Sequence, residues 1–290
     1  ISTNLPLVTF NFPLASLSCC FQNDNYGYAG GLDCYIHQLQ IEKGSTNHIG
    51  SHLAPISSLK YSYDYNLLYS GSWDQTVGIW DSRTSSSPSS PLRMSGKVYS
   101  ISLTSTRLVV ATSDRRIIVY DQRNLSTPEQ IRESPLRYLT RHISCFPNGE
   151  GFAIGSIEGR VAIEYFDTVS TLNDPSKNYA FKCHRKGDLA YPVNSIAFHP
   201  IYGTFATGGG DGTVSTWDGI NKKKLCQYPQ YPTSIASLAF NYDGTILAIA
   251  SSYTFEEGEK PPSTTTTGLD DNVFLRTVND LDVRPRPKTQ

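Results

Sequence analysis

The sequence predicts an all-β fold built from one repeated unit. Residues 70–81 read Ser-Gly-Ser-Trp-Asp-Gln-Thr-Val-Gly-Ile-Trp-Asp, and residues 209–218 nearly copy them with the same six-residue step from the turn aspartate to a tryptophan. Weaker copies lie near residues 30, 112 and 155. Each copy has an acid in its turn: Asp33, Asp74, Asp114, Glu158 and Asp211. These acids follow one another by 41, 40, 44 and 53 residues, a period typical of the blades of a WD-repeat β-propeller.

Four short strands are expected in each repeat. In the repeat at residues 56–80, short runs with β-branched or aromatic alternation are separated by turn residues. Six blade signatures are visible, at turns near residues 33, 74, 114, 158 and 211 and in the loop at 253–270. The longest step is explained by insertions at 168–174 and 186–189. We expect one propeller domain over 1–290, with an irregular start at 1–13, a mobile loop at 254–269 and a fraying tail at 284–290.

Composition narrows the function classes. The chain has 290 residues, 38% of them hydrophobic, a formal net charge of -1 and a pI near 6.6. This balance argues against a nucleic-acid binder that relies on bulk positive charge, so any recognition of anions must be local. No apolar run approaches the roughly 20 residues of a membrane span, and no signal peptide is expected. The six cysteines form no C-x-x-C pair, which favours a reducing compartment over zinc or a disulfide framework.

The turn acids and their tryptophans are predicted to be structural. In a WD blade, the turn aspartate, a histidine from the preceding loop, a serine or threonine and the tryptophan form a buried hydrogen-bond chain, because buried polar groups need partners. The spacing fits two such sets: His52 with Asp74 and Trp80, and His184 with Asp211 and Trp217.

No catalytic constellation is found. The sequence has no G-x-S-x-G, no phosphate-binding glycine loop followed by a helix and no H-E-x-x-H. The acids Glu256, Glu257 and Glu259 fall in the expected mobile loop, which cannot hold two carboxylates at a working separation. We therefore expect no enzyme activity, no cofactor and no metal.

Two basic stretches are the candidate binding elements. Residues 221–224 read Asn-Lys-Lys-Lys and residues 182–186 read Lys-Cys-His-Arg-Lys. We expect both on one rim of the propeller, where they would form a compact positive patch suited to an acidic or phosphorylated peptide. The alternative, that these are scattered surface lysines which only keep the protein soluble, stays open.

Several stretches resemble one family within the WD-repeat class. The resemblance is carried by residues 156–165, 179–185, 205–209, 221–227, 231–240 and 243–253. These stretches are similar to the mitotic spindle-assembly checkpoint WD-repeat protein of the "budding uninhibited by benzimidazole" group. The resemblance covers roughly residues 14–283 and is densest in the second half.

The resemblance implies a non-enzymatic adaptor in the nucleus and at mitotic kinetochores. Family members bind a short acidic segment of a checkpoint kinase and of its pseudokinase-like relative, and they dock on phosphorylated Met-Glu-Leu-Thr motifs of a kinetochore scaffold. The mitotic checkpoint complex is a further implied partner, without direct nucleic-acid or membrane binding. By position, Arg185 and Lys182 would bind the partner segment, and Lys224 with Lys223 and Lys222 would bind the phosphopeptide.

Two departures from the family accompany the resemblance. Where the family commonly has arginine, Lys224 keeps the charge but loses the bidentate fork, so weaker phosphate binding is expected. The family is seven-bladed, and nothing before Leu14 matches its first repeat. The sequence therefore predicts either a six-bladed ring or a seven-bladed one whose first repeat is missing here. The messenger-RNA export WD-repeat factor is the alternative family branch, and a ubiquitin-ligase substrate receptor is a more distant one.

Overall fold

The computed structural model describes residues 8–81, 90–167, 173–174, 176–254 and 271–286. Residues 255–269 of the expected loop, 287–290 of the expected tail and 1–7 of the irregular start lie outside the described residues. The chain forms two compact units, Ile1–Glu133 and Ser134–Gln290. Within the described residues, no helix has the length and hydropathy needed to cross a membrane.

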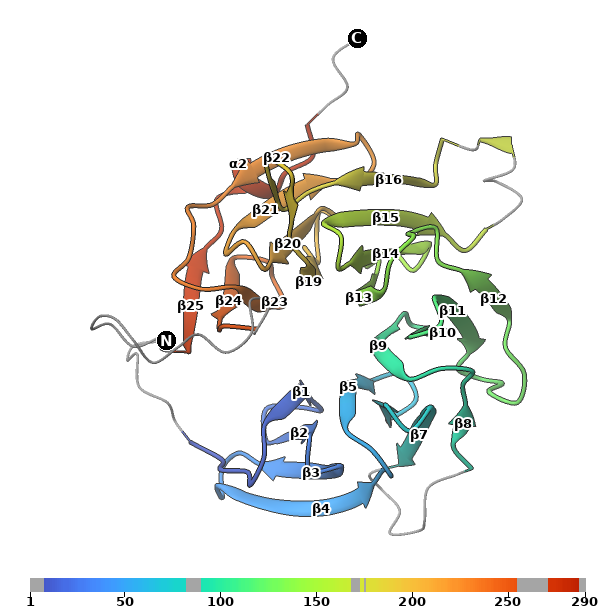
Figure 1. The fold of residues 1–290 in the computed structure, drawn as a ribbon. Helices are drawn as coiled ribbons and strands as arrows, with labels where there is room; N and C mark the ends of the chain where they lie inside the picture. Colours follow the sequence, from blue (N-terminus) through green and yellow to red (C-terminus); the bar gives the residue numbers. More distant parts are fainter. Residues whose placement is uncertain (1–7, 82–89, 168–172, 175, 255–270, 287–290) are drawn as a thin grey trace. The chain divides into compact units, whose positions relative to one another are not determined.

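The first unit contains three four-stranded antiparallel sheets, which we call blades 1, 2 and 3 (Figure 1). In each sheet the strands pair in chain order. Blade 1 consists of β1 (Ser16–Phe21), β2 (Tyr26–Gly31), β3 (Tyr35–Gln40) and β4 (Ser45–Ser51). Blade 2 consists of β5 (Ile56–Ser62), β6 (Leu67–Ser72), β7 (Thr76–Asp81) and β8 (Leu92–Arg93). Blade 3 consists of β9 (Val98–Leu103), β10 (Arg107–Thr112), β11 (Arg116–Asp121) and β12 (Gln130–Glu133).

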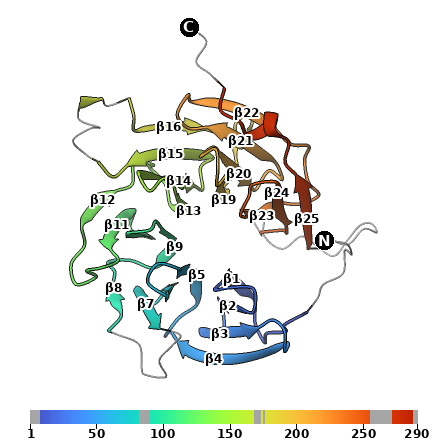
Figure 2. The same cartoon turned by 180° about the vertical axis from the view of Figure 1, so that it is seen from behind.

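The second unit contains blades 4, 5 and 6 and a small hairpin (Figure 2). Blade 4 consists of β13 (Thr140–Cys145), β14 (Gly151–Ser156), β15 (Arg160–Tyr165) and β16 (Tyr179–Lys182). The hairpin pairs β17 (Arg185–Lys186) with β18 (Leu189–Ala190). Blade 5 consists of β19 (Val193–Phe198), β20 (Phe205–Gly209), β21 (Val214–Asp218) and β22 (Lys223–Gln227). Blade 6 has three described strands, β23 (Ile235–Phe240), β24 (Ile246–Ser251) and β25 (Asn272–Thr277), and α2 (Asp280–Val283) follows.

Neighbouring blades within each unit share their hydrophobic cores. Tyr69 and Val77 of blade 2 pack with Val98 and Ile101 of blade 3, for example. The sheets come so close that a glycine is required at the end of the second strand. A Cβ on Gly71 would lie 2.5 Å from Val98 Cγ1, and one on Gly208 would lie 2.4 Å from Ile235 Cγ2. The repeated glycine of the sequence motif therefore makes room for the first strand of the next blade.

The predicted all-β, WD-repeat fold class is confirmed, with six blade sheets in the described part of the chain. The expected insertion at 186–189 takes part in the β17–β18 hairpin, whose loop contains Gly187 at φ +58°. The described end of the chain is attached to blade 5: the Arg286 amide donates to Asp218 at 3.2 Å, and the Asn221 side chain donates to the Arg286 carbonyl at 3.1 Å. A seventh blade stays a prediction.

Candidate binding site

A buried hydrogen-bond chain anchors the loop that carries the basic residues of blade 5. The Trp217 indole N–H donates to Thr207 Oγ1 at 2.9 Å, and Thr207 Oγ1 lies 2.8 Å from His184 Nε2. On the other side of the ring, His184 Nδ1 lies 2.9 Å from Asp211 Oδ1, while the Thr213 hydroxyl donates to Asp211 Oδ2 at 2.9 Å. Every polar group of the chain is paired, as burial requires.

Blade 2 of the first unit contains the same chain. Trp80 donates to Ser70 Oγ at 2.7 Å, and Ser70 Oγ lies 2.7 Å from His52 Nε2. The His52 Nδ1 atom lies 3.0 Å from Asp74 Oδ2, and the Thr76 hydroxyl donates to Asp74 Oδ1 at 2.6 Å. Both histidines are thus held on two sides within their own unit.

The aspartates are stabilised as carboxylates. Burial opposes ionisation of Asp211. The hydrogen bond to His184, the charge of His184 and the hydrogen bonds from Thr213 outweigh this effect, so the pKa of Asp211 lies below its ordinary value. The pKa of Asp74 is lowered in the same way, with Thr76, the Leu53 amide and His52 opposing the effect of burial. These groups are engaged in holding the blade together.

Arg185 directly follows the anchored histidine. His184 has φ +48°, an uncommon conformation for this residue, which its side-chain bonds hold in place. The exposed Arg185 guanidinium donates through Nη2 to the Glu158 carbonyl at 2.7 Å and through Nε to the Gly159 carbonyl at 3.4 Å. Two backbone oxygens of the blade 4 turn therefore orient a cation that still faces solvent.

Two further lysines lie at the same edge of the blades as Arg185. Lys182 ends β16, pairs with Arg160 in the sheet and is exposed. The Lys186 ammonium lies 3.4 Å from Gln230 Oε1 and 6.0 Å from the centroid of the Tyr191 ring. We call Lys182, Arg185 and Lys186 the Arg185 edge.

The three lysines of the second stretch have different surroundings. Lys222 lies in the β21–β22 turn with φ +56°, and its ammonium donates to the Ser176 carbonyl at 2.6 Å and lies 4.7 Å from the centroid of the Tyr179 ring. Lys223 pairs with Asp218 in the sheet and is half-buried. Lys224 is exposed, donates to Gln227 Oε1 at 2.5 Å and lies 5.5 Å from the centroid of the Trp217 ring.

The charges of Arg185 and Lys224 both act on one buried thiol, Cys183. Burial raises the pKa of Cys183 to about 12, and the positive charges of Arg185 and Lys224 both oppose that rise. Next to this thiol, the Phe181 and Trp217 rings pack at 4.7 Å between centroids. Lys224 thus lies over one ring of this aromatic pair, and the Arg185 charge acts on the thiol next to it. We call Phe181 and Trp217 the aromatic base, and we call Lys182, Arg185, Lys224, Phe181 and Trp217 the candidate site.

The expectation that both basic stretches lie on one rim is wrong for Lys222. The β21 strand starts after the Asp211 turn, next to His184, and ends at the turn that contains Lys222. Lys222 therefore lies at the opposite end of β21 from Arg185. The error arose because residues 221–222 connect the third and fourth strands of one blade, whereas residues 183–192 connect two blades.

The aromatic base was not predicted as part of a site. The sequence predicts only a scaffold role for Trp217 and no site role for Phe181. Trp217 lies opposite Lys224 in the β21–β22 pair only because the register shifts between Thr216 and Trp217, which no signal in the sequence indicates. Within the described residues, no group of three His, Cys, Asp or Glu side chains is arranged to hold a metal ion.

The repeated blades and their histidine–aspartate chains define a WD-repeat β-propeller protein. In agreement, the family described as "WD domain, G-beta repeat" matches residues 44–81 and 176–218. Mitotic checkpoint protein BUB3.1 of Arabidopsis thaliana is 48% identical over 296 residues, which cover 99% of this chain and 85% of the relative. Mitotic checkpoint protein bub-3 of Caenorhabditis elegans is 41% identical over 276 residues, covering 93% and 79%. The chain belongs to the BUB3 family of mitotic checkpoint WD-repeat proteins, as the sequence stretches predicted.

A second branch of relatives is also similar. The mRNA export factor GLE2 of Chaetomium thermophilum is 35% identical over 277 residues, covering 93% of this chain and 75% of the relative. The checkpoint relatives are thus more similar to this chain than this export factor.

Proposed function

We propose that this chain is a non-enzymatic adaptor of the spindle assembly checkpoint, acting in the nucleus and at mitotic kinetochores. The printed names of its relatives at 48% and 41% identity support a checkpoint role. The observation that carries the proposal is a pair of exposed cations on rigid supports, because such cations suit an acidic or phosphorylated peptide. Arg185 is held by two backbone carbonyls, and Lys224 lies over the Trp217 ring.

In this proposal, Arg185 and Lys182 bind a short acidic segment of a checkpoint kinase or of its pseudokinase-like relative. Arg185 is oriented by two carbonyls before the partner arrives, so little side-chain entropy is lost on binding. Its planar fork can pair with a glutamate carboxylate through two hydrogen bonds, and Lys182 adds charge at the same edge.

Lys224 is the proposed contact for a phosphothreonine of a kinetochore scaffold that carries phosphorylated Met-Glu-Leu-Thr motifs. Lys224 is exposed, and its ammonium lies over the Trp217 ring and donates to the neutral Gln227 amide oxygen. Lys223 and Lys222 would contribute long-range charge, since Lys222 is already bonded to the Ser176 carbonyl. Docking on this scaffold would bring the kinases, and with them the mitotic checkpoint complex, to one place.

The test is a pair of threonine peptides that differ only in phosphorylation, titrated into the full chain by fluorescence anisotropy. We expect the phosphorylated peptide to bind at least tenfold more tightly, and Lys224→Glu to remove this preference. Lys43→Glu, at an exposed lysine of the first unit, makes the same charge change as a control and should leave binding intact. Equal affinity for the two peptides would refute the phosphopeptide role.

The second candidate is a nuclear-pore-associated messenger-RNA export factor. The observation in its favour is the 35% identity to an mRNA export factor over most of the chain. Imaging of a tagged full-length chain separates the two functions. Enrichment at unattached kinetochores in mitosis supports the checkpoint adaptor, whereas steady association with nuclear pores in interphase and none with kinetochores supports export.

A further inference from the structure

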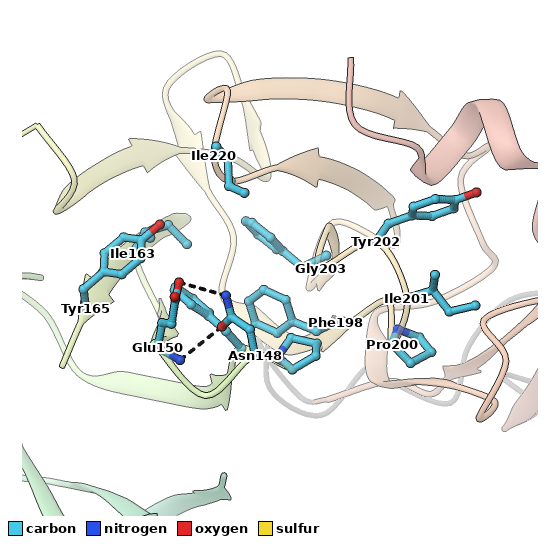
Figure 3. A pocket seen from close by; sticks show the side chains of 14 residues that line it. Asn148, Glu150, Ile163, Tyr165, Phe198, Pro200, Ile201, Tyr202, Gly203 and Ile220 are labelled. Carbon is cyan, nitrogen blue, oxygen red and sulfur yellow. Dashed lines mark hydrogen bonds between the residues drawn. The ribbon is translucent and has the colours of Figure 1, made fainter. Parts of the chain in front are cut away.

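A cavity of about 390 Å³ lies in the second unit, at the edge of blades 4 and 5 opposite the Arg185 edge (Figure 3). Its walls come from four places that are distant in the sequence: the β13–β14 turn, the end of β15, the β19–β20 turn and the β21–β22 turn. Pockets of about 300–1,000 Å³ are large enough for a small ligand or an inserted side chain.

Aromatic rings form a continuous wall of this cavity. The Phe146 ring lies 5.3 Å between centroids from both Tyr165 and Phe198, and Phe198 lies 5.2 Å from Phe205. Phe205 is 1% exposed and forms part of the floor. The faces of such rings attract cations through their quadrupole as well as apolar groups.

One exposed carboxylate, that of Glu150, lines the cavity beside these rings and is held in one orientation. Glu150 Oε2 accepts a hydrogen bond from the Asn148 side chain at 2.9 Å, and the Glu150 amide donates to Asn148 Oδ1 at 3.1 Å, as the dashed lines in Figure 3 show. No ion pair links Glu150 to a lysine or arginine in the part of the chain that the structure describes. The pKa of Tyr165 is raised, first by burial and then by the Glu150 charge, so the negative potential reaches the aromatic wall.

The Glu150 charge favours a basic side chain inside the cavity, and the apolar rim favours a hydrophobic side chain next to that basic residue. Lys222 shares the β21–β22 turn, but its ammonium is directed to the Ser176 carbonyl and the Tyr179 ring, which are not lining groups. At the rim, Ile201 and Ile220 are 69% and 72% exposed. Exposed apolar side chains next to a hollow are typical of a docking surface for another chain.

We propose that this cavity binds a short extended segment of a protein partner, whose arginine or lysine side chain enters between the aromatic rings to meet Glu150. An apolar side chain next to that basic residue would cover Ile201 and Ile220. The rings would contact the aliphatic stem and attract the cation, and the carboxylate would pair with its head group. Blades 4 and 5 would then select acidic segments at the Arg185 edge and basic segments at the opposite edge.

The probe is a nonapeptide, Gly-Ser-Gly-Ile-Arg-Ile-Gly-Ser-Gly, titrated into the full-length ¹⁵N-labelled chain. We expect saturable amide shifts at Glu150, Tyr165 and Ile220, and at least fivefold weaker binding when glutamine replaces the arginine. Glu150→Gln should weaken binding of the arginine peptide by a similar factor. Glu42→Gln, which neutralises an exposed acid of the first unit, is the matched control and should retain binding.

Three results would overturn this proposal: equal binding of the arginine and glutamine peptides, shifts confined to residues outside the cavity, or unchanged binding by Glu150→Gln. Lys224→Glu should not affect this peptide. The cavity can therefore fail its test while the phosphopeptide site passes, and the reverse holds as well.

Discussion

Blades 2 and 5 contain the same buried chain but differ in what surrounds it. His52 with Asp74 and His184 with Asp211 are bonded at 3.0 Å and 2.9 Å, each with a tryptophan bonded through a hydroxyl. After His52 comes Leu53, which is 96% exposed, whereas after His184 comes the exposed cation of Arg185.

The outer strands of these blades differ too. In blade 2, β8 has two residues and Trp80 is only 7% exposed. In blade 5, β22 has five residues, and Lys224 lies over a half-buried Trp217. The same network can thus support an apolar residue or an exposed cation. The network fixes the position, and the residue after the histidine sets the chemical character of the surface there.

Removing the turn acid should have the largest effect. We expect Asp211→Ala to lower the free energy of unfolding by about 3–4 kcal/mol, because it leaves His184 and Thr213 buried without their partner. Asp74→Ala should cost about 2 kcal/mol, since the Asp74 side chain is 10% exposed and Asp211 is 5% exposed. Urea denaturation measures both. Asp188→Ala, at an exposed hairpin position, is the control, and equal losses in all three variants would contradict the prediction.

Substitutions of the residue after each histidine should differ in their effect on binding of an acidic segment. Arg185→Glu should weaken binding of a glutamate-rich kinase segment by about 2–3 kcal/mol, or 30- to 150-fold, because it removes an oriented guanidinium and adds repulsion. Leu53→Glu makes a new charge at the equivalent position of blade 2 and should leave binding unchanged. Isothermal titration of the full chain measures both, and an equal loss in the two variants would show that the segment binds elsewhere.

A conservative change at Lys224 should strengthen phosphopeptide binding by a smaller amount. Lys224→Arg introduces a fork that can hold two phosphate oxygens while keeping its contact with the Trp217 ring, so we expect phosphopeptide binding to tighten by about 1 kcal/mol, roughly fivefold. The unphosphorylated peptide serves as the control. Tightening of both peptides alike would show that the gain does not come from phosphate.

Acid should affect the two networks in the same direction. The pKa of Asp211 is lower in the folded chain than its ordinary value near 3.9, so its stabilising contribution is present above that value and is lost as the pH falls through the folded pKa. The free energy of unfolding should thus drop as the pH falls below about 4, and the drop should be smaller in Asp211→Asn. An unchanged drop in this variant would assign the acid sensitivity to other groups.

The sequence predicts the inner strands well and the outer strands poorly. The β5, β6 and β7 strands carry buried β-branched and aromatic residues bounded by turns, and this alternation indicates them directly. In contrast, β4 reads Ser-Thr-Asn-His-Ile-Gly-Ser and is mostly exposed. It is a strand because β3 offers it backbone partners, which no local pattern reveals.

The candidate site was only partly predictable for a similar reason. The charges of Arg185 and Lys224 are visible in the sequence. The repeat period does not indicate which end of a blade a turn occupies, so the sequence alone does not separate Lys222 from them. The cavity at Glu150 is less predictable still, because Phe146, Phe198 and Ile220 come together only when two blades pack. Its position depends on tertiary structure, not on any single motif.

The buried thiols have a consequence for site-specific labelling. Burial raises the pKa of Cys20 and Cys183 to about 12, and it also raises the pKa of Cys34 and Cys226. Cys145 is buried, whereas Cys19 is exposed. Maleimide dyes react with thiolate, so at neutral pH Cys19 is the main native competitor. The β17–β18 loop is open at Gly187, with no atom within 4 Å of an added Cβ. A Cys19→Ser, Asp188→Cys chain would therefore accept one fluorophore three residues from Arg185, where its emission would report the arrival of a partner in real time.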